Sequence, residues 1–372
     1  MSDELKQTPL RELHRRSGGR LVGFAGWELP VQYAGINEEH QAVRQRVGIF
    51  DVSHMGQIEV EGPQALVFLQ HLLPPDLERL AVGGLCYAVM CDPAGGAIDD
   101  LLVYRLGEQH YLLVVNASRV DADLDWIGEQ AGAYGGARVV LRGAAWGMLA
   151  LQGPLAAQAL GEVGAGRALD LGYLEHQVAR VAGVPVLVSR SGYTGEDGFE
   201  LICPADCLVP VWEALVARNV QPCGLGARDV LRTEMGYCLY GHELTSAITP
   251  LEAGLSWSLA LDKEPGFVGC EALRQQAQTG GFRRLVGLSL VEQGIPRPEY
   301  RVVDPQGREV GQVSSGTFSP GLQRGIALAY VEAECHLPGT RLAVEVRGKL
   351  RWAEVVRTPF VPSRTKRRRP SR

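Results

Sequence analysis

Charged side chains that could do chemistry gather first in a glycine-rich stretch, Ser189–Glu200, between the apolar runs 184–188 and 201–202. This pattern is typical of a strand, a turn and a second strand. Glu200 follows Phe199 at the edge of the core, where a desolvated carboxylate is stable only with a partner. A planar N–H donor suits such a group. A solvated hairpin with Glu200 facing water is the alternative.

A second candidate donor lies in Gly224–Asp229, a flexible entry into a helix whose first turn exposes Arg228. A guanidinium offers two parallel N–H donors, which suits a carboxylate or a planar ligand. The alternative is a surface arginine that pairs with Asp229 or Glu234.

Two adjacent carboxylates, Asp99 and Asp100, interrupt the apolar segment 98–103. Neighbouring strand residues point to opposite faces, so one of the two must face inward if one side of the sheet is covered. An inward carboxylate is costly unless it is hydrogen-bonded or functional. We expect Asp100 to be the inward one and Asp99, on the other face, to contribute much less. A wet aspartate at a strand edge is the alternative.

The histidines give weaker evidence for a catalytic or metal site. Asp51, Ser53 and His54 lie close in sequence, but no nucleophile-elbow pattern supports a triad, and structural roles are favoured for Ser53 and His54. The other histidines form no metal-ligand spacing, so no metal site is expected.

These residues must be positioned by a mixed set of elements. We expect a helix over 10–17, capped by Thr8, and another that begins at Asn37 and ends at Gly48. Further helices are predicted at 63–72, 119–131, 204–218 and 227–235, and strands at 85–90, 98–105, 111–115, 137–142, 146–151, 174–181, 184–190 and 198–203. Helices and hairpins alternate without regular βαβ spacing, which favours an α+β fold.

The pattern of predicted secondary structure changes after residue 280. Short, turn-bounded, β-rich segments follow at 284–290, 300–303, 308–313, 326–331, 341–347 and 350–356. They predict a separate barrel or sandwich of about 80 residues.

Composition narrows the class of protein. The formal net charge is −5, and the basic end Lys366–Arg372 offsets a more acidic body, which makes a poor nucleic-acid binder. No GxGxxG or P-loop pattern follows a strand, so no nucleotide cofactor is expected. The eight cysteines form no CxxC pair, the N-terminus lacks a signal-peptide pattern, and no apolar run is long enough for a membrane. We predict a cytoplasmic protein with free thiols.

Several motifs in order carry a family resemblance. They are Phe24–Trp27 with Pro30–Tyr33, Phe50–Met55, Gly95–Asp100, Gly192–Glu200, Gly226–Asp229, Leu239–Leu244, Thr249–Leu255 and Pro359–Pro362. Together the sequence resembles aminomethyltransferase, the T-protein of the glycine cleavage system, over residues 8–362.

The resemblance implies a folate-binding body of two intertwined subdomains, one of them ferredoxin-like, and a C-terminal β-barrel. We expect the body at 1–280, the barrel at 281–362 and a disordered basic tail at 363–372. The implied reaction moves a methylene carbon from the aminomethyl-lipoyl arm of H-protein to tetrahydrofolate, giving 5,10-methylenetetrahydrofolate, ammonia and the dihydrolipoyl carrier.

The resemblance also assigns residue roles. Asp100 falls on the catalytic aspartate, Glu200 on the pterin-recognising glutamate and Arg228 on the folate-contacting arginine. Tyr193 and Met55 fall on residues that line the folate site.

One departure concerns the C-terminus. Several family members carry a folate-site tyrosine after Pro-Phe-Val-Pro, whereas this sequence continues Ser363–Lys366. Arg364 is the candidate replacement.

Two other functions occur in the same superfamily. A demethylation module of sarcosine or dimethylglycine dehydrogenases is expected to accompany a flavin-binding domain, for which this sequence shows no GxGxxG pattern. A non-enzymatic iron-sulfur maintenance protein would carry Lys-Gly-Cys-Tyr-x-Gly-Gln-Glu, whereas Gly236–Glu243 departs from it.

Overall fold

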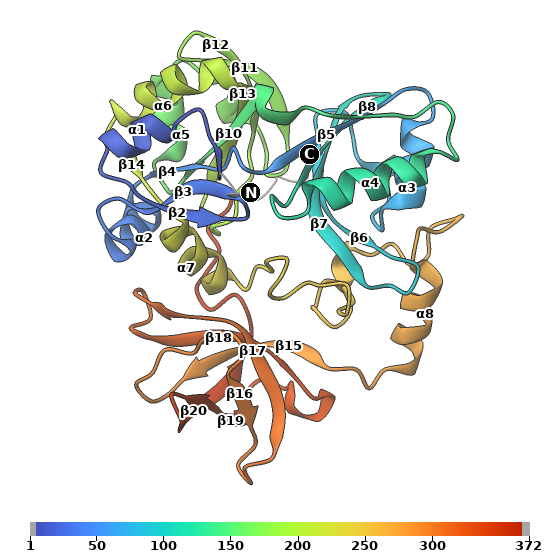
Figure 1. The fold of residues 1–372 in the computed structure, drawn as a ribbon, viewed down its shortest axis with the longest axis vertical. Coiled ribbons are helices and arrows are strands. Elements are labelled where there is room, and N and C mark those ends of the chain that lie inside the picture. Colours follow the sequence, from blue (N-terminus) through green and yellow to red (C-terminus); the bar gives the residue numbers. More distant parts are fainter. Residues whose placement is uncertain (1–4, 367–372) are drawn as a thin grey trace.

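The computed structural model describes residues 5–366 and divides into a broad body and a smaller barrel (Figure 1). The body holds a six-stranded sheet, a five-stranded sheet and a small three-stranded sheet. The predicted α+β body with a C-terminal barrel is confirmed.

The six-stranded sheet has the order β11-β12-β13-β10-β4-β14. Its strands are β4 (Gly48–Asp51), β10 (Trp146–Gln152), β11 (His176–Val181), β12 (Val184–Ser189), β13 (Gly198–Pro204) and β14 (Gln221–Pro222). Helices α1 (Arg11–Arg16), α5 (Ala156–Glu162) and α6 (Leu208–Val216) lie on its outer side.

Strand β10 shows why both faces of this sheet are covered. Leu149 and Leu151 join the core beneath the helices, whereas Met148 and Ala150 join a second core shared with the other large sheet. Because successive residues of a strand point to opposite faces, β10 contributes side chains to a core on each side of the sheet.

The five-stranded sheet has the order β6-β7-β8-β5-β9. Its strands are β5 (Gly56–Glu61), β6 (Leu85–Cys91), β7 (Ala97–Gly107), β8 (His110–Val115) and β9 (Arg138–Leu141). Helices α3 (Ala65–Leu72) and α4 (Val120–Ala131) cover one face. The chain thus leaves the first sheet after β4, builds the second, and returns at β10, which intertwines the two subdomains.

The remaining elements close the body and form the barrel. The small sheet contains β1 (Lys6–Gln7), β2 (Arg20–Phe24) and β3 (Trp27–Gln32), and the other helices are α2 (Ile36–Gln45), α7 (Leu225–Met235) and α8 (Cys270–Thr279). Strands β15 (Arg284–Leu290), β16 (Arg301–Val303), β17 (Glu309–Ser319), β18 (Arg324–Val331), β19 (Arg341–Val346) and β20 (Lys349–Val356) form the closed barrel. Short 3₁₀ turns lie at Leu77–Arg79, Gly143–Ala145, Gly166–Asp170, Ala205–Cys207, Ser256–Ser258 and Ala333–Cys335.

Most predicted elements are present, but both predicted N-caps are wrong. Gly35 precedes α2, and Asn37 lies inside the helix. Thr8 does not cap α1; its hydroxyl donates instead to the buried Asp51 carboxylate at 2.6 Å. Helix α8 was not predicted from the sequence.

The remaining global predictions have separate outcomes. All eight cysteines are free, as predicted. Among residues 5–366 no helix has the length and apolar character needed to cross a bilayer. The predicted disordered tail lies partly outside the described residues, at 367–372.

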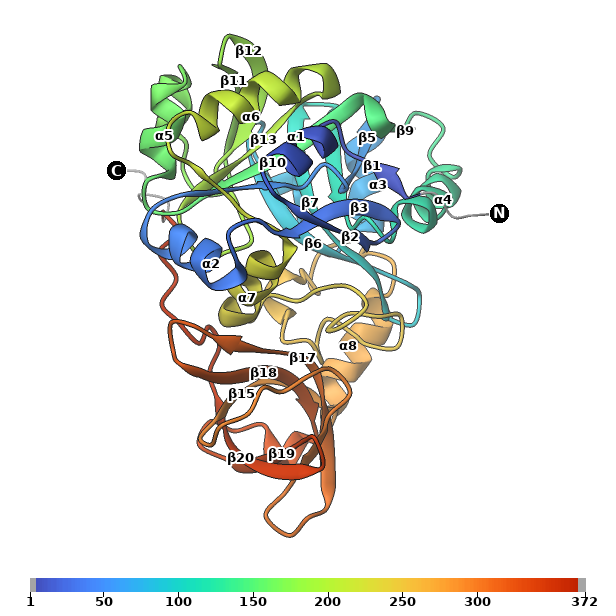
Figure 2. The same cartoon turned by 60° about the vertical axis from the view of Figure 1, so that its left-hand side comes forward.

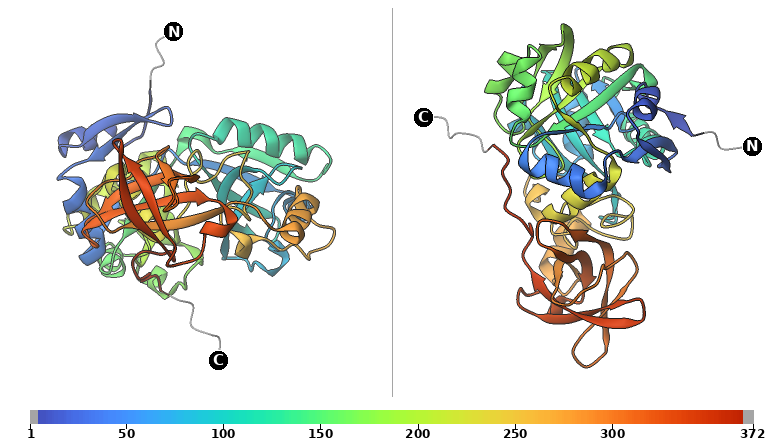
Figure 3. Two further views of the ribbon diagram at one scale, coloured as in Figure 1. Left: turned by 90° about the horizontal axis from the view of Figure 1, so that it is seen from below. Right: turned by 90° about the vertical axis from the view of Figure 1, so that its left-hand side faces the viewer.

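Helix α7 lies between the body and the barrel (Figure 2). Its Glu234 carboxylate is fully buried and accepts hydrogen bonds from His40 Nε2 at 2.9 Å, Arg44 Nη2 at 2.6 Å and the barrel hydroxyl Ser319 Oγ at 2.5 Å. The Glu234 backbone carbonyl accepts from Phe360 N, where the C-terminal segment returns from the barrel along the body (Figure 3). One side chain therefore joins α2, α7 and β17.

We predict that Glu234→Ala lowers the free energy of unfolding by about 3 to 5 kcal/mol, because it removes the buried carboxylate that accepts hydrogen bonds from His40, Arg44 and Ser319. Burial alone would raise the pKa of Glu234, but His40 and Arg44 outweigh it and lower the pKa. The stabilisation is thus fully present above the unfolded pKa of about 4.3 and is lost as the pH falls through the lower folded pKa. Urea unfolding at pH 7 and pH 4 measures both effects.

The matched control is Glu213→Ala, on the exposed face of α6. Equal losses in the two variants would contradict the role assigned to Glu234.

Candidate functional site

A cavity of about 1410 Å³ lies between the sheets of the body, α7 and the loop that follows residue 252, and the barrel strands β15 and β18 also contribute to its lining. The two large sheets contribute Asp100 and Glu200 to its wall, and α7 contributes Arg228. Tyr193 and Met55 also line it. The structure therefore brings together five of the six residues singled out from the sequence.

Glu200 is buried beside the cavity, with 5% of its surface exposed. It is paired with Ser189 across β12 and β13, and its Oε2 accepts a hydrogen bond from Ser191 Oγ at 2.5 Å. Burial raises the pKa of Glu200, while Ser191 and the charge of Arg228 act in the opposite direction. The solvated-hairpin alternative is wrong, since this carboxylate is desolvated and faces a cation.

Arg228 projects from the first turn of α7, and its guanidinium lies 4.8 Å from the centroid of the Tyr193 ring. Its Nη1 is buried and has no hydrogen-bond partner among residues 5–366. Burial lowers the pKa of Arg228, and Tyr193 and Glu200 partly offset that effect. The alternative pairings are wrong, because Asp229 accepts from Arg232 at 2.8 Å and Glu234 binds His40 and Arg44. Arg228 thus holds an unused donor at the cavity wall.

The loop that carries Tyr193 is held by Gln152, whose amide donates to Ser191 O at 3.0 Å and accepts from Thr194 Oγ1 at 2.7 Å. Gly192 permits this approach, since a Cβ there would lie 2.0 Å from Gln152 Oε1. The Tyr193 hydroxyl donates to the Cys238 carbonyl. The aromatic ring is thereby fixed beneath Arg228.

Asp100 reaches the cavity from β7. Its carboxylate accepts hydrogen bonds from Tyr87 Oη at 3.1 Å and Asn116 Nδ2 at 2.8 Å. Burial, followed by the charge of Asp99, raises the pKa of Asp100 to about 7. A carboxylate with such a pKa can change its protonation state near neutral pH, which is typical of catalytic groups.

Asp99 lies on the opposite face, as predicted, but it is not exposed. Helix α4 covers that face, and Asp99 is fully buried. Asn116 Nδ2 also donates to Asp99 Oδ1, at 2.9 Å. The expectation that Asp99 contributes less than Asp100 stays a prediction.

No triad forms around Asp51, which accepts from His14 Nε2 at 2.9 Å and from Thr8. His54 instead lines the cavity, with its ring edge-on to Phe24 at 5.8 Å. The predicted purely structural role of His54 overlooked this place at the cavity wall.

Arg364 is not brought to the cavity. Its backbone N donates to Gly195 O at 2.7 Å, and its Nη1 donates to Arg44 O at 3.2 Å. Its side chain is 60% exposed and lies 3.6 Å from Glu196 Oε1. The sequence-based placement of Arg364 in the folate channel is therefore corrected: the residue fastens the C-terminal segment to the outside of the 194–196 turn.

Tyr87 and Asn116 are site residues that sequence reasoning missed. Tyr87 lies in an alternating strand, where its ring could equally belong to the core. Asn116 follows β8 at a position typical of a turn. Only the pairing of β6 and β8 with β7 places both beside Asp100.

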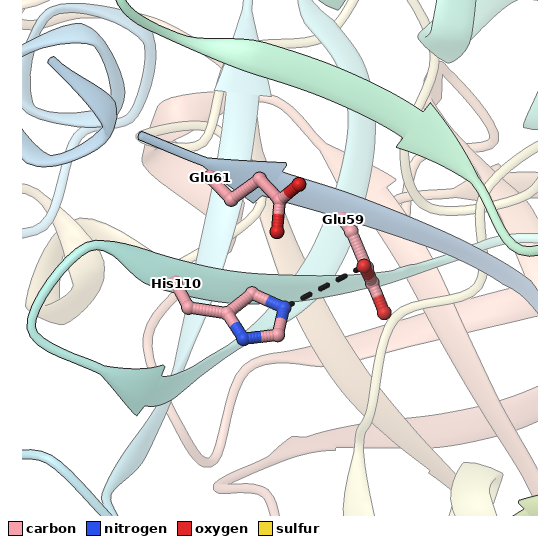
Figure 4. Close-up of side chains that lie close together, drawn as sticks. All are labelled: Glu59, Glu61 and His110. Atoms are coloured by element: carbon pink, nitrogen blue, oxygen red, sulfur yellow. Dashed lines mark ion pairs between the residues drawn. The ribbon is translucent and has the colours of Figure 1, made fainter. Parts of the chain in front are cut away.

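A separate surface cluster contains Glu59, Glu61 and His110 (Figure 4). His110 Nε2 lies 3.5 Å from Glu59 Oε2. Both carboxylates also pair with arginines, Glu59 with Arg142 and Glu61 with Arg138. Because these cations already neutralise the carboxylates, the cluster gives no argument for a metal ion.

Comparison with known proteins identifies the family. Residues 10–263 match the GCVT N-terminal domain, and residues 283–362 match the glycine cleavage T-protein C-terminal barrel domain. The chain belongs to the glycine cleavage T-protein family. The resemblance found in the sequence is thereby confirmed.

Full-length relatives of this T-protein family support the assignment. An aminomethyltransferase of Geobacillus thermodenitrificans is 46% identical over 96% of this chain and 98% of that protein, and one of Bacillus subtilis is 44% identical over 96% and 99%. The crystal structure of glycine cleavage system aminomethyltransferase T from Bartonella henselae superimposes with a TM-score of 0.90 at 36% identity, covering 97% of this chain and 99% of that one. The expected aminomethyltransferase is confirmed, and neither alternative of the superfamily is favoured.

We predict that His54 stays neutral in the folded protein throughout pH 5 to 8. Burial, followed by the charge of Arg228, lowers its pKa to about 4, although Asp51 acts in the opposite direction. Because the unfolded chain protonates this histidine near pH 6.5, His54 costs stability as the pH falls from about 6.5 toward 4. Imidazole ¹⁵N shifts, assigned with His54→Gln, measure its protonation. A midpoint above pH 6 would contradict the prediction.

Proposed function

We propose that the chain transfers the methylene carbon of an aminomethyl group from the dihydrolipoyl arm of H-protein to tetrahydrofolate. The observation that carries this proposal is the single cavity into which Asp100, Glu200 and Arg228 all open. Full-length similarity to aminomethyltransferases supports the same reaction class.

The described residues fit a reduced folate. A pterin presents an amino group beside a ring N–H, and the Glu200 carboxylate can accept from both together. Arg228 has an unpartnered Nη1 that can donate to a ring or side-chain acceptor of the same molecule. The Tyr193 ring, whose centroid lies 4.8 Å from the Arg228 guanidinium, lines the same cavity.

The cavity is large enough for two reactants. Pockets for drug-sized ligands usually measure roughly 300 to 1,000 Å³, and this cavity measures about 1410 Å³. We infer that the excess volume admits the aminomethyl-bearing arm beside folate. Holding both reactants in one enclosure removes much of the entropic cost of their encounter.

The proposed transfer balances without any redox step. The carbon loses its bonds to sulfur and to the amino nitrogen and gains bonds to N5 and N10 of folate. Nitrogen leaves as ammonia and sulfur as a thiol, which together take up the two protons released by folate.

We assign to Asp100 the role of stabilising the positive charge that develops during this reaction. Its ionised form stabilises the cationic iminium character of the carbon as ammonia leaves. Tyr87 and Asn116 hold the carboxylate in one orientation through their hydrogen bonds. Activity should therefore require ionised Asp100 and fall as the pH drops through about 7.

The domain boundaries, the cellular location and the absence of other partners stay proposals. We place the folate-binding body at 1–280, the barrel at 281–362 and a tail at 363–372. A cytoplasmic location and the absence of nucleic-acid, metal and nucleotide partners stay predictions from the sequence.

We predict that Asp100→Asn lowers turnover by about a hundredfold or more, because it removes a positioned negative charge. The assay is ammonia release from aminomethylated, lipoylated H-protein with and without tetrahydrofolate. Asp125→Asn, on the exposed face of α4, is the matched control. Ammonia release at the same rate with and without tetrahydrofolate would contradict the proposed reaction. Wild-type turnover in Asp100→Asn would contradict only the role assigned to this residue.

We predict that Glu200→Gln and Arg228→Ala each weaken tetrahydrofolate binding by about 2 to 5 kcal/mol, since each leaves a buried polar partner unmatched. Calorimetric titration measures the affinity. Glu354→Gln and Arg324→Ala, exposed on the barrel, are the controls. Unaltered affinity in both site variants would move the pterin site elsewhere.

A further inference from the structure

The back of the strand that carries Asp100 holds a second pair of carboxyl groups. Asp99 on β7 and Asp123 on α4 are both completely buried, with 0% of their surfaces exposed. We propose that Asp123 is a positioning residue: as a neutral carboxylic acid it donates to Asp99, which together with Asn116 fixes the Asp100 carboxylate at the cavity wall. This inference rests on the function proposed for Asp100.

Asn116 connects the two faces of β7. Its backbone N donates to Asp99 Oδ2 at 2.9 Å, and its Nδ2 donates to Asp99 Oδ1 at 2.9 Å. The same Nδ2 also donates to Asp100 Oδ1 at 2.8 Å. The orientation of Asn116, and hence of its contact with Asp100, is therefore set by Asp99.

Asp123 completes this chain of contacts. Neither of its oxygens receives a hydrogen bond from a nitrogen or hydroxyl donor within residues 5–366. The neighbouring carboxyl is that of Asp99, whose charge acts on the pKa of Asp123 more strongly than any influence except burial. Two carboxyl groups share a hydrogen bond only when one of them carries a proton, and a buried carboxylate without a donor would be very costly.

The charged groups around Asp123 favour the neutral form. Burial, followed by the charge of Asp99, raises the pKa of Asp123 to about 10, and Asp100 adds to this effect. Arg119 is the opposing cation, but its Nε donates to the Ile98 carbonyl at 3.1 Å and its guanidinium lies 4.8 Å from the centroid of the Tyr240 ring. Asp99 and Asp123 thus hold one proton and one negative charge between them near neutral pH.

The negative charge shared by Asp99 and Asp123 also affects Asp100 at the cavity wall. The negative charge of Asp99 is, after burial, the next contribution to the raised pKa of Asp100, and Tyr87 and Asn116 oppose it. Without the proton on Asp123, Asp99 would lose the donor that stabilises its charge. Asp99 would then take up a proton itself, and the pKa of Asp100 would fall.

A direct test follows the proton and does not depend on catalysis. Protein labelled with ¹³C at the aspartate carboxyl carbons should show one aspartate that stays protonated from pH 5 to 8. That signal should vanish in Asp123→Asn and persist in Asp121→Asn, an exposed neighbour on α4. A carboxyl of Asp123 that ionises near pH 4 would overturn the proposal whatever Asp100 does.

A kinetic test separates positioning from mere packing. Asp123→Leu, which has no donor, should lower turnover on the order of ten- to a hundredfold with little change in the KM for tetrahydrofolate. Asp123→Asn should rescue most of this loss, because its amide can donate to Asp99 as the acid does.

The pH profile adds a readout that packing alone would not move. The acidic limb of kcat/KM should shift to lower pH in Asp123→Leu and in Asp99→Asn, and stay in place in Asp123→Asn. An Asp123→Asn enzyme as impaired as Asp123→Leu, or an unmoved limb in Asp99→Asn, would overturn the proposal. If Asp123→Leu fails to fold, the carboxyl titration and the Asp99→Asn profile still decide it.

Discussion

Desolvation of a few ionisable groups between two packed sheets is the constraint on which the site depends. The core shared by the sheets contains Phe50, Tyr104 and Met148, and the cavity opens beside it. Charged groups in such surroundings lose their hydration and respond strongly to each other. This is why Glu200, Arg228 and Asp100 all have shifted pKa values. An exposed hairpin with the same residues would give none of these shifts.

Helix α7 connects the cavity both to the core shared by the sheets and to the barrel. Ala227 and Leu231 pack into the core shared by the sheets, and Arg228 faces the cavity. One turn later, Arg232 donates to Glu243 Oε2 at 2.8 Å and to the barrel residue Ser315 at 2.7 Å. Gly236 ends the helix with φ +70°, and a Cβ there would lie 2.6 Å from Thr358 Cβ. The barrel therefore supports the helix that presents Arg228.

Strand β7 shows how a two-sided sheet couples a site to its surroundings. Its alternation sends Asp100 to the cavity and the fully buried Asp99 to α4, so each face of one strand carries a carboxyl group. A single amide, Asn116, bonds to both carboxylates. In this geometry the protonation of a carboxyl behind the sheet influences a carboxylate in front of it.

The sequence by itself determined the alternation of strands and helices, the change to short strands after residue 280, and the carboxylates and arginine that had to find partners. These features depend on local periodicity and on the cost of burying charge, which can be read residue by residue. Tertiary structure alone decided which partners they found. Thr8 bonds to Asp51 instead of capping a helix, Arg364 binds the outer turn at Gly195, and Asp99 meets a covering helix instead of water. Each outcome depends on contacts between segments distant in the chain, and no local pattern encodes which segment will cover a given face.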